Sequence, residues 1–196
     1  MQSFDFKKII DQKEILYLKD VYYDYTKNDF VKNTVSNEYF SRKHLIYERA
    51  NSKIAEIFNK LNFSANQINQ LNNKNDKLTL STSYFQMYYP GAFNVLHKDN
   101  ISKDGVTIVT LLDIADDIIG GDPFIFLEGK EVANNNSIDT GQRIYGFSFA
   151  YEDCNIPFSA PQTIGTSMIY LSDLEHGVSY LYQGYRLVLV TWFDCK

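Results

Sequence analysis

The chain has 196 residues and a mass of 22.7 kDa, which suits one compact domain. Hydrophobic residues make up 44% of it and charged residues 22%, so the composition excludes wholesale disorder. The net charge is −5 and Lys and Arg form no long cluster, which argues against nucleic acid as a main partner.

The first third of the chain predicts helices. Apolar residues recur near helical spacing over 6–17 and, more clearly, over 39–61. Either Ser36 or Asn37 is expected to cap the second helix, because both side chains accept hydrogen bonds from the free amides at a helix start. The stretch 62–77 is rich in Asn and Gln and is expected to form a short helix and a loop.

From residue 78 onward, short runs of β-branched, aromatic and other apolar residues alternate with turns rich in Gly, Asn, Asp and Pro. The predicted strands cover 78–88, 93–97, 106–112, 124–127, 144–150, 163–171, 178–182 and 187–193. Strands punctuated in this way are typical of a sandwich, a barrel or a cupin-type jelly roll. We therefore expect one domain over 1–196, of class α+β but mainly β, in which a helical support region (1–77) buttresses a jelly-roll core (78–193).

The histidines offer a candidate metal site. His97 comes at the end of a predicted strand, and Asp99 follows two residues later, so both side chains can point to the same side. With His176, they make the set of two imidazoles and one carboxylate that leaves positions open on non-haem Fe(II). The pair alone is weak evidence, since an acid follows a given His at this spacing about one time in eight by chance. His44, by contrast, is expected to be a partly exposed residue of the second helix.

Arg186 adds to this pattern. It precedes the apolar strand 187–193 and comes ten residues after His176. Strand alternation places Arg186 with Val188, Val190 and Trp192 on the side that faces the interior. A buried guanidinium is costly unless an anion meets it, so an anionic partner is expected there.

The order of several motifs resembles the prolyl 4-hydroxylase-like 2-oxoglutarate/Fe(II) dioxygenases. These motifs are the segment YYPGAFNVLHKD at 88–99, the turn Gly120-Gly121 before the strand 124–127, and Gly184-Tyr185-Arg186 after His176. The resemblance covers roughly 78–193. It implies a double-stranded β-helix core, with Fe(II), 2-oxoglutarate and O2 as cofactor and co-substrates.

The resemblance also implies residue roles. His97, Asp99 and His176 match the metal ligands, and Arg186 matches the residue that holds the far carboxylate of 2-oxoglutarate. Tyr88 matches a tyrosine that hydrogen-bonds the same carboxylate, with its neighbour Tyr89 facing away. The alternative is that both tyrosines are core aromatics. The acidic turn 113–117 is about two residues longer than in the family, which leaves open which side chain of 106–112 lies beside the co-substrate.

The implied reaction is hydroxylation of an unactivated C–H bond, with release of succinate and CO2. Asp99 supports hydroxylation, because related halogenases carry a small residue at this place. The substrate stays open between an amino acid, a peptidyl residue and a small biosynthetic intermediate. Two other readings are a cupin-like metal protein that does not use 2-oxoglutarate and a binding module without activity.

The loops 100–105, 130–141 and 152–162 are expected to contact the substrate. Four acidic side chains weakly favour a zwitterionic or basic substrate: Asp113, Asp116, Asp117 and Asp122. No apolar run is long enough to span a membrane, no signal-peptide pattern is present, and Cys154 and Cys195 form no metal or disulfide motif. A cytoplasmic protein with no membrane partner is therefore expected.

Overall fold

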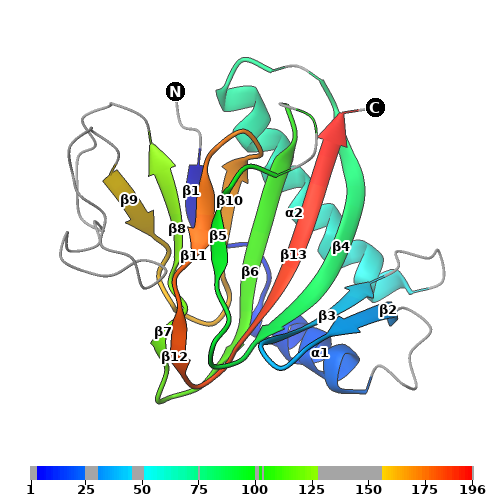
Figure 1. The fold of residues 1–196 in the computed structure, drawn as a ribbon. Helices are drawn as coiled ribbons and strands as arrows, with labels where there is room; N and C mark the ends of the chain where they lie inside the picture. Colours follow the sequence, from blue (N-terminus) through cyan, green and yellow to red (C-terminus); the bar gives the residue numbers. More distant parts are fainter. Residues whose placement is uncertain are drawn as a thin grey trace.

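The protein is described by a computed structural model that covers residues 4–24, 31–45, 51–74, 76–99, 102, 104–127 and 156–195. Two antiparallel sheets face each other, with two helices beside the larger one (Figure 1). The larger sheet runs in the order β1 (Phe4–Lys8), β10 (Thr166–Leu171), β6 (Val106–Ile114), β13 (Arg186–Cys195), β4 (Leu78–Tyr88), β3 (Phe40–Leu45) and β2 (Val31–Ser36).

The smaller sheet has four strands in the order β5 (Asn94–His97), β11 (His176–Val178), β8 (Pro123–Leu127) and β9 (Ile156–Ser159). A separate short pair joins β7 (Ile119–Gly120) to β12 (Leu181–Gln183). In both sheets, strands that are distant in the sequence lie side by side, as in a jelly roll. The expected fold class, mainly β with supporting helices, is confirmed.

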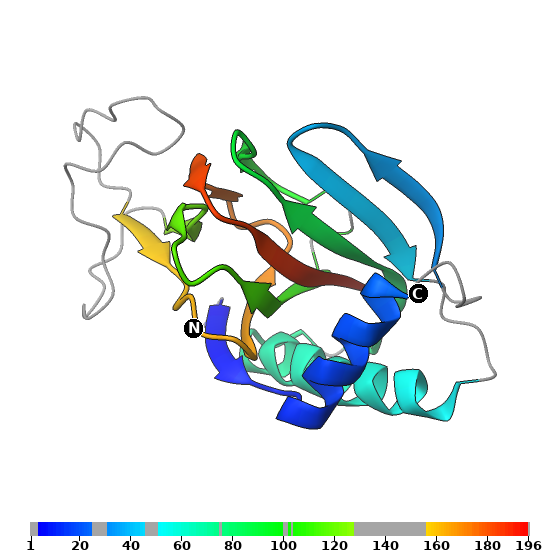
Figure 2. The same cartoon turned by 90° about the horizontal axis from the view of Figure 1, so that it is seen from below.

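The helices α1 (Gln12–Tyr23) and α2 (Ser52–Leu71) cover one face of the larger sheet, as the blue and cyan coils in Figure 2 show. Apolar side chains from both helices and from that face form the main core. The fully buried members include Leu18, Ile57, Leu61, Phe85, Ile108, Leu187 and Leu189. The expectation that helices buttress one face of the sheet is therefore correct.

The predicted boundaries in the first third were wrong. Residues 4–8 and 40–45 are strands, and α2 begins after the N-cap Asn51, whose Oδ1 accepts from the amides of Lys53 and Ile54 at 3.0 and 3.1 Å. Asn37 instead accepts the amides of Tyr39 and Phe40 in the turn between β2 and β3. The helical pattern over 39–61 combined residues of a strand with residues of the helix that follows.

His44 is correspondingly a strand residue rather than a helical one. It lies on β3 opposite Tyr84 of β4, and the two ring centroids are 5.4 Å apart. Alternation along β3 follows period two, since every second residue is buried. The physical reason for the error is that β3 owes its strand form to pairing with β4, a contact between residues far apart in the chain.

The strands predicted after residue 78 are confirmed where the structure describes them, with small shifts. β6 continues to Ile114, and the predicted strand 178–182 is divided between β11 and β12. The short strands β7 and β9 were not predicted. The predicted strand 144–150, the loop 130–141 and Cys154 lie outside the described residues.

The larger sheet separates two environments. On β13, Leu187 and Leu189 join the core beneath the helices, whereas Val188 and Val190 face the smaller sheet. Arg186 lies on the same side as these valines and lines a pocket between the sheets. The expected alternation on this strand is therefore correct. No helix in the described part of the chain combines the length and the apolar character needed to cross a membrane.

Candidate active site

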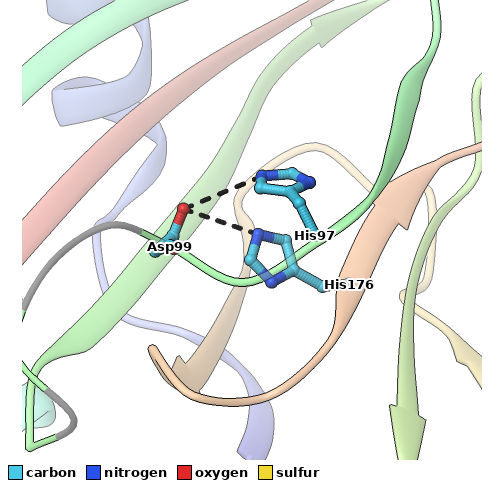
Figure 3. Close-up of side chains that lie close together, drawn as sticks. All are labelled: His97, Asp99 and His176. Atoms are coloured by element: carbon cyan, nitrogen blue, oxygen red, sulfur yellow. Dashed lines mark ion pairs between the residues drawn. The ribbon is translucent and has the colours of Figure 1, made fainter.

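Three predicted residues meet in the pocket between the sheets. His97 on β5 and His176 on β11 lie directly opposite each other in neighbouring strands, and Asp99 follows two residues after His97. Oδ1 of Asp99 is 3.9 Å from Nε2 of His97 and 3.6 Å from Nε2 of His176 (Figure 3). Their possible ligand atoms all lie within 4.8 Å of one another. Strand pairing therefore supplies both imidazoles and holds them beside one carboxylate.

Hydrogen bonds set the tautomer of both imidazoles. Nδ1 of His97 lies 2.7 Å from the carbonyl oxygen of Val95, and Nδ1 of His176 lies 2.9 Å from that of Leu174. A carbonyl oxygen only accepts hydrogen bonds, so both Nδ1 atoms carry a hydrogen and donate it. The lone pair then remains on each Nε2, the atom that faces Asp99. Bonds of this kind are what orient metal-ligating histidines.

The Asp99 carboxylate is held from the opposite sheet. Thr107 on β6 donates its hydroxyl hydrogen to Oδ2, and the Asp99 amide donates to the carbonyl of Ser172 at 3.2 Å. Burial raises the pKa of Asp99, but the hydrogen bond and charge that His176 supplies when it is protonated, together with the hydrogen bond of Thr107, more than offset this, and the pKa is lowered. The carboxylate is therefore ionised at neutral pH and keeps Oδ1 directed at the histidines.

These donors fit a non-haem Fe(II) centre. Two neutral imidazole nitrogens and one carboxylate oxygen on one side of an ion leave its other positions open. The side chains of Asp99 and His176 are only 5% and 7% exposed, whereas that of His97 is 38% exposed. Solvent and small molecules can therefore approach from the His97 side.

Arg186 lies in the same pocket and is buried, with 3% of its surface exposed. Its Nε and Nη1 atoms have no hydrogen-bond partner among the described residues. Burial lowers the pKa of the guanidinium, and the nearby Tyr88 and Asp122 offset part of that effect. Asp122 itself accepts hydrogen bonds from Gln162 and Ser179, at 2.5 and 3.3 Å. The pocket thus contains a buried cation with unsatisfied donors.

The two adjacent tyrosines face opposite ways. Tyr88 lines the pocket directly opposite Arg186, and its ring lies 5.7 Å from the guanidinium carbon. Asn94 on β5 donates its side-chain amide to the Tyr88 hydroxyl oxygen at 3.0 Å. Tyr89 packs against the core on the helix side. Only Tyr88 is therefore placed to contact a ligand beside Arg186.

The sequence did not predict several contacts of the site. On the strand 106–112, Thr107 contacts Asp99 and Val109 lines the pocket. Strand alternation could have shown that they share a face. Asp113 was interpreted as an indication of a zwitterionic or basic substrate, but it pairs with Lys19 of α1 at 2.9 Å on the helix side. That interpretation is therefore wrong for Asp113.

The sequence matches no protein-family model and no curated protein. Solved structures do match over nearly the whole chain. A Pseudomonas putida prolyl-4-hydroxylase aligns at 14% identity with a TM-score of 0.60, covering 100% of this chain and 94% of that one. HygX from Streptomyces hygroscopicus, solved with nickel, 2-oxoglutarate and hygromycin B, aligns at 13% identity with a TM-score of 0.60, covering 99% and 83%.

A third similar structure shows that this fold carries other reactions. The 2-oxoglutarate-dependent carbocyclase SnoK from nogalamycin biosynthesis aligns at 10% identity with a TM-score of 0.65, covering 98% of this chain and 80% of that one. At such low identity the similarity establishes the fold alone. The chain thus has the fold of the 2-oxoglutarate/Fe(II) oxygenases, and this fold brings His97, Asp99 and His176 together in one pocket.

Proposed function

We propose that this protein is an Fe(II)- and 2-oxoglutarate-dependent oxygenase that hydroxylates an unactivated C–H bond. One observation carries the proposal: the pocket that contains the three candidate ligands also contains the buried guanidinium of Arg186, two of whose nitrogens have no partner in the described part of the chain. A metal site alone does not need this cation. A co-substrate that chelates a metal at one end and carries a carboxylate at the other needs both.

The metal ligands in this proposal are Nε2 of His97, Nε2 of His176 and Oδ1 of Asp99. These three residues would hold the ion and would leave it open to further ligands. Iron, when bound, supplies the redox chemistry that couples decarboxylation of 2-oxoglutarate to oxidation of the substrate. The chain itself keeps both imidazoles in the ligating tautomer and keeps Asp99 ionised.

Arg186 is the proposed partner of the 5-carboxylate of 2-oxoglutarate. A guanidinium can form two parallel hydrogen bonds with a carboxylate, and Nε and Nη1 both lack partners in the described residues. Tyr88, directly opposite on β4, offers a further hydrogen bond to the same group. Binding the co-substrate would therefore satisfy donors that are otherwise buried without acceptors.

The pocket walls are suited to excluding water. Tyr84, Tyr170 and Trp192 line the pocket together with the metal-binding residues, and burial raises the pKa of Tyr84 and Tyr170 above its ordinary value. These phenols therefore stay neutral during turnover. Asp99 supports hydroxylation in particular, because an intact carboxylate ligand fills the place that halogenases leave open. We propose an amino acid, a peptidyl residue or a small biosynthetic intermediate as the substrate.

The test is anaerobic titration of the purified protein with Fe(II) and 2-oxoglutarate, followed by the weak visible metal-to-ligand absorption band. We expect the band in the wild type and a far weaker affinity for 2-oxoglutarate in Arg186→Ala. Removing one partner of a buried charge pair costs about 3–5 kcal/mol, roughly a hundred- to several-thousand-fold in affinity. Arg186→Lys should keep part of the affinity, because it retains the charge but loses the planar fork.

The control is 2-oxopentanoate, which keeps the chelating keto acid but lacks the far carboxylate. It should bind wild type and Arg186→Ala with similar affinity. Equal binding of 2-oxoglutarate by both proteins would refute the co-substrate assignment and favour a cupin-like metal protein that does not use 2-oxoglutarate. Release of succinate in the presence of candidate amino acids and proline-containing peptides would then identify the substrate.

A further inference from the structure

A second arginine lies beside the pocket, away from Arg186. Arg42 is half-buried on β3, which extends the larger sheet beyond β4, at the end of the sheet opposite to β1 (Figure 1). It pairs with Gln86 of β4 in the strand register. Its guanidinium carbon is 4.4 Å from the ring centroid of Tyr84, which lines the pocket. The guanidinium of Arg42 therefore lies over a side chain of the pocket wall.

The contacts of Arg42 fix its guanidinium but leave its charge uncompensated. Nε and Nη2 donate to Oε1 of Gln86 at 3.0 and 2.7 Å, and the Gln86 side chain is neutral. No carboxylate in the described part of the chain pairs with Arg42. A guanidinium has more N–H groups than these two bonds use, and the remaining ones form a planar fork that matches a carboxylate. Arg42 thus presents a fixed cation that lacks an anion.

Trp192 adds an unsatisfied donor to the same part of the pocket wall. It lies on β13, lines the pocket, and its ring centroid is 6.0 Å from that of Tyr84. Its Nε1 atom is buried and has no hydrogen-bond partner among the described residues. An indole N–H only donates, so an acceptor on a bound molecule would satisfy it. Arg42 and Trp192 therefore offer one charged and one neutral donor beside the same tyrosine.

These donors lie at the metal end of the pocket and not at the end that holds Arg186. Trp192 is six residues from Arg186 along β13, roughly 20 Å at the usual rise of a strand. It lies directly opposite Thr107 of β6, whose hydroxyl donates to Asp99. A five-carbon keto acid held at Arg186 by its far carboxylate is much shorter than this separation and cannot reach both places. The donors beside Tyr84 are therefore left for a different molecule.

We propose that Arg42 and Trp192 bind a carboxylate of the primary substrate and so hold the substrate beside the metal ligands. This inference rests on the proposed function and narrows its substrate to one that carries a carboxylate. His44 does not supply the positive charge: burial, and after it the charge of Arg42, lowers the pKa of this imidazole, which lies 5.4 Å from the Tyr84 ring. The inference assigns part of the substrate site to a strand outside the 78–193 core.

The test uses the fluorescence of Trp192, because this residue is the only tryptophan in the chain. The protein is loaded with Zn(II), which has no redox chemistry, and saturated with 2-oxoglutarate, so that the Arg186 end is already occupied. Matched acids and amides are then titrated: free L-amino acids against their amides, capped peptides containing Asp or Glu against the same peptides containing Asn or Gln, and short monocarboxylic acids against their amides.

We expect at least one of these acids to change the Trp192 emission. Its amide should bind at least about tenfold more weakly, a size typical of a hydrogen bond between charged groups. The set that contains this acid shows whether the carboxylate belongs to a free amino acid, to a peptide side chain or to another small molecule.

Variants separate this role from a general effect of charge. Arg42→Met should bind the acid at least about tenfold more weakly and change the affinity for its amide much less. Lys8→Met removes the same charge from an exposed residue of β1, at the other end of the larger sheet, and should bind the acid as wild type does. Trp192→Phe lacks the N–H group and should lose roughly two- to tenfold in affinity, measured by calorimetry. Thermal unfolding and 2-oxoglutarate binding check the fold of each variant.

The possible failures are distinct. If Arg42→Met binds the acid as tightly as wild type, or if the amide binds as tightly as the acid, the carboxylate site is wrong and the proposed function stands. The same holds if the wild type binds 2-oxoglutarate but none of the acids changes the Trp192 emission. If the wild-type protein does not bind 2-oxoglutarate at all, both the proposed function and this inference fail.

Discussion

The two faces of the larger sheet differ in what their side chains need. Beneath the helices, Leu187 and Leu189 are fully buried among other apolar groups and need no specific partner. On the other face, Arg186 is almost as deeply buried, but two of its nitrogens lack partners among the residues that the structure describes. One strand thus contributes to a core that stabilises the fold and to a pocket that is incomplete without a ligand. Stability and binding therefore depend on alternate residues of the same strand, which face opposite sides of the sheet.

This difference has an energetic consequence. Burial of apolar surface stabilises the folded chain by about 25 cal/mol per Å², whereas burial of an unpaired charge opposes folding. The pocket face is therefore expected to lower the stability of the ligand-free protein, and ligands should restore it. Truncation of a core residue on the helix face should therefore lower stability without changing binding. Replacement of Arg186 on the pocket face should instead raise the stability of the ligand-free protein and weaken binding.

The largest expected effect is the loss of a metal ligand on the pocket side. In His176→Ala, metal affinity should fall by more than the roughly 10–100-fold that follows removal of an outer-shell partner, and succinate release should stop. Anaerobic calorimetric titration with Fe(II) measures the affinity. His44→Ala removes a histidine from β3, a strand of the larger sheet, and should bind metal as wild type does. Unchanged metal binding in His176→Ala would exclude the facial ligand set.

On the helix side, Leu189→Ala should reduce the free energy of unfolding by about 2–5 kcal/mol, because the deletion leaves a cavity in a closely packed core. Metal affinity of the folded fraction should not change. Urea unfolding monitored by circular dichroism gives the stability. Leu16→Ala is the matched control, since Leu16 is 50% exposed on α1 and should change stability by less than about 0.5 kcal/mol. A strong loss of metal affinity in Leu189→Ala would show that the faces are not independent.

Arg186→Met should stabilise the metal-free and ligand-free protein, by about 1–4 kcal/mol, because an apolar side chain replaces a buried group that lacks its partner. The same variant should lose the stabilisation that 2-oxoglutarate gives to the wild type in the presence of metal. Thermal unfolding with and without both ligands measures the two effects. The control Arg42→Met should not stabilise, since it removes a guanidinium that is hydrogen-bonded to Gln86. A destabilised Arg186→Met apoprotein would mean that the guanidinium already has a stabilising partner.

The smallest expected effect is in the helix layer. Asn51→Ala removes the N-cap of α2 and its hydrogen bond to Tyr17, and should reduce the free energy of unfolding by about 1 kcal/mol. Asn59→Ala on the exposed side of the same helix should slightly raise it, because alanine has the better helix propensity. Neither change should affect 2-oxoglutarate binding. The same loss for both variants would show that Asn51 acts through something other than capping.

Much of the site could be predicted from the sequence because it depends on local geometry. A spacing of two in an extended segment places His97 and Asp99 on the same side of the chain. Alternation on β13 places Arg186 and Leu187 on opposite faces of the sheet. These relations hold within a few residues whatever the rest of the fold does. The order of motifs along 78–193 then related them to one another and to His176. The opposite orientations expected for Tyr88 and Tyr89 follow from the same local rule.

The first third of the chain shows where local patterns fail. The residues 39–61 contain a strand, a segment outside the described residues and the start of a helix, yet their apolar spacing predicts one helix. β3 forms a strand because it pairs with the edge of β4, and β4 lies more than 30 residues further along the chain. His44 was misplaced for this reason alone.

The sequence by itself determined most of the described strands after residue 78, the faces of β13 and the candidate ligands, because period-two alternation and short spacing are properties of the chain. Only the tertiary structure decided that β5 and β11 pair His97 with His176 and that Thr107 of the opposite sheet holds Asp99. It also decided that Arg42 lies beside Gln86 and Tyr84. These contacts join residues separated by up to 79 positions along the chain, and only strand pairing and the packing of the two sheets bring them together.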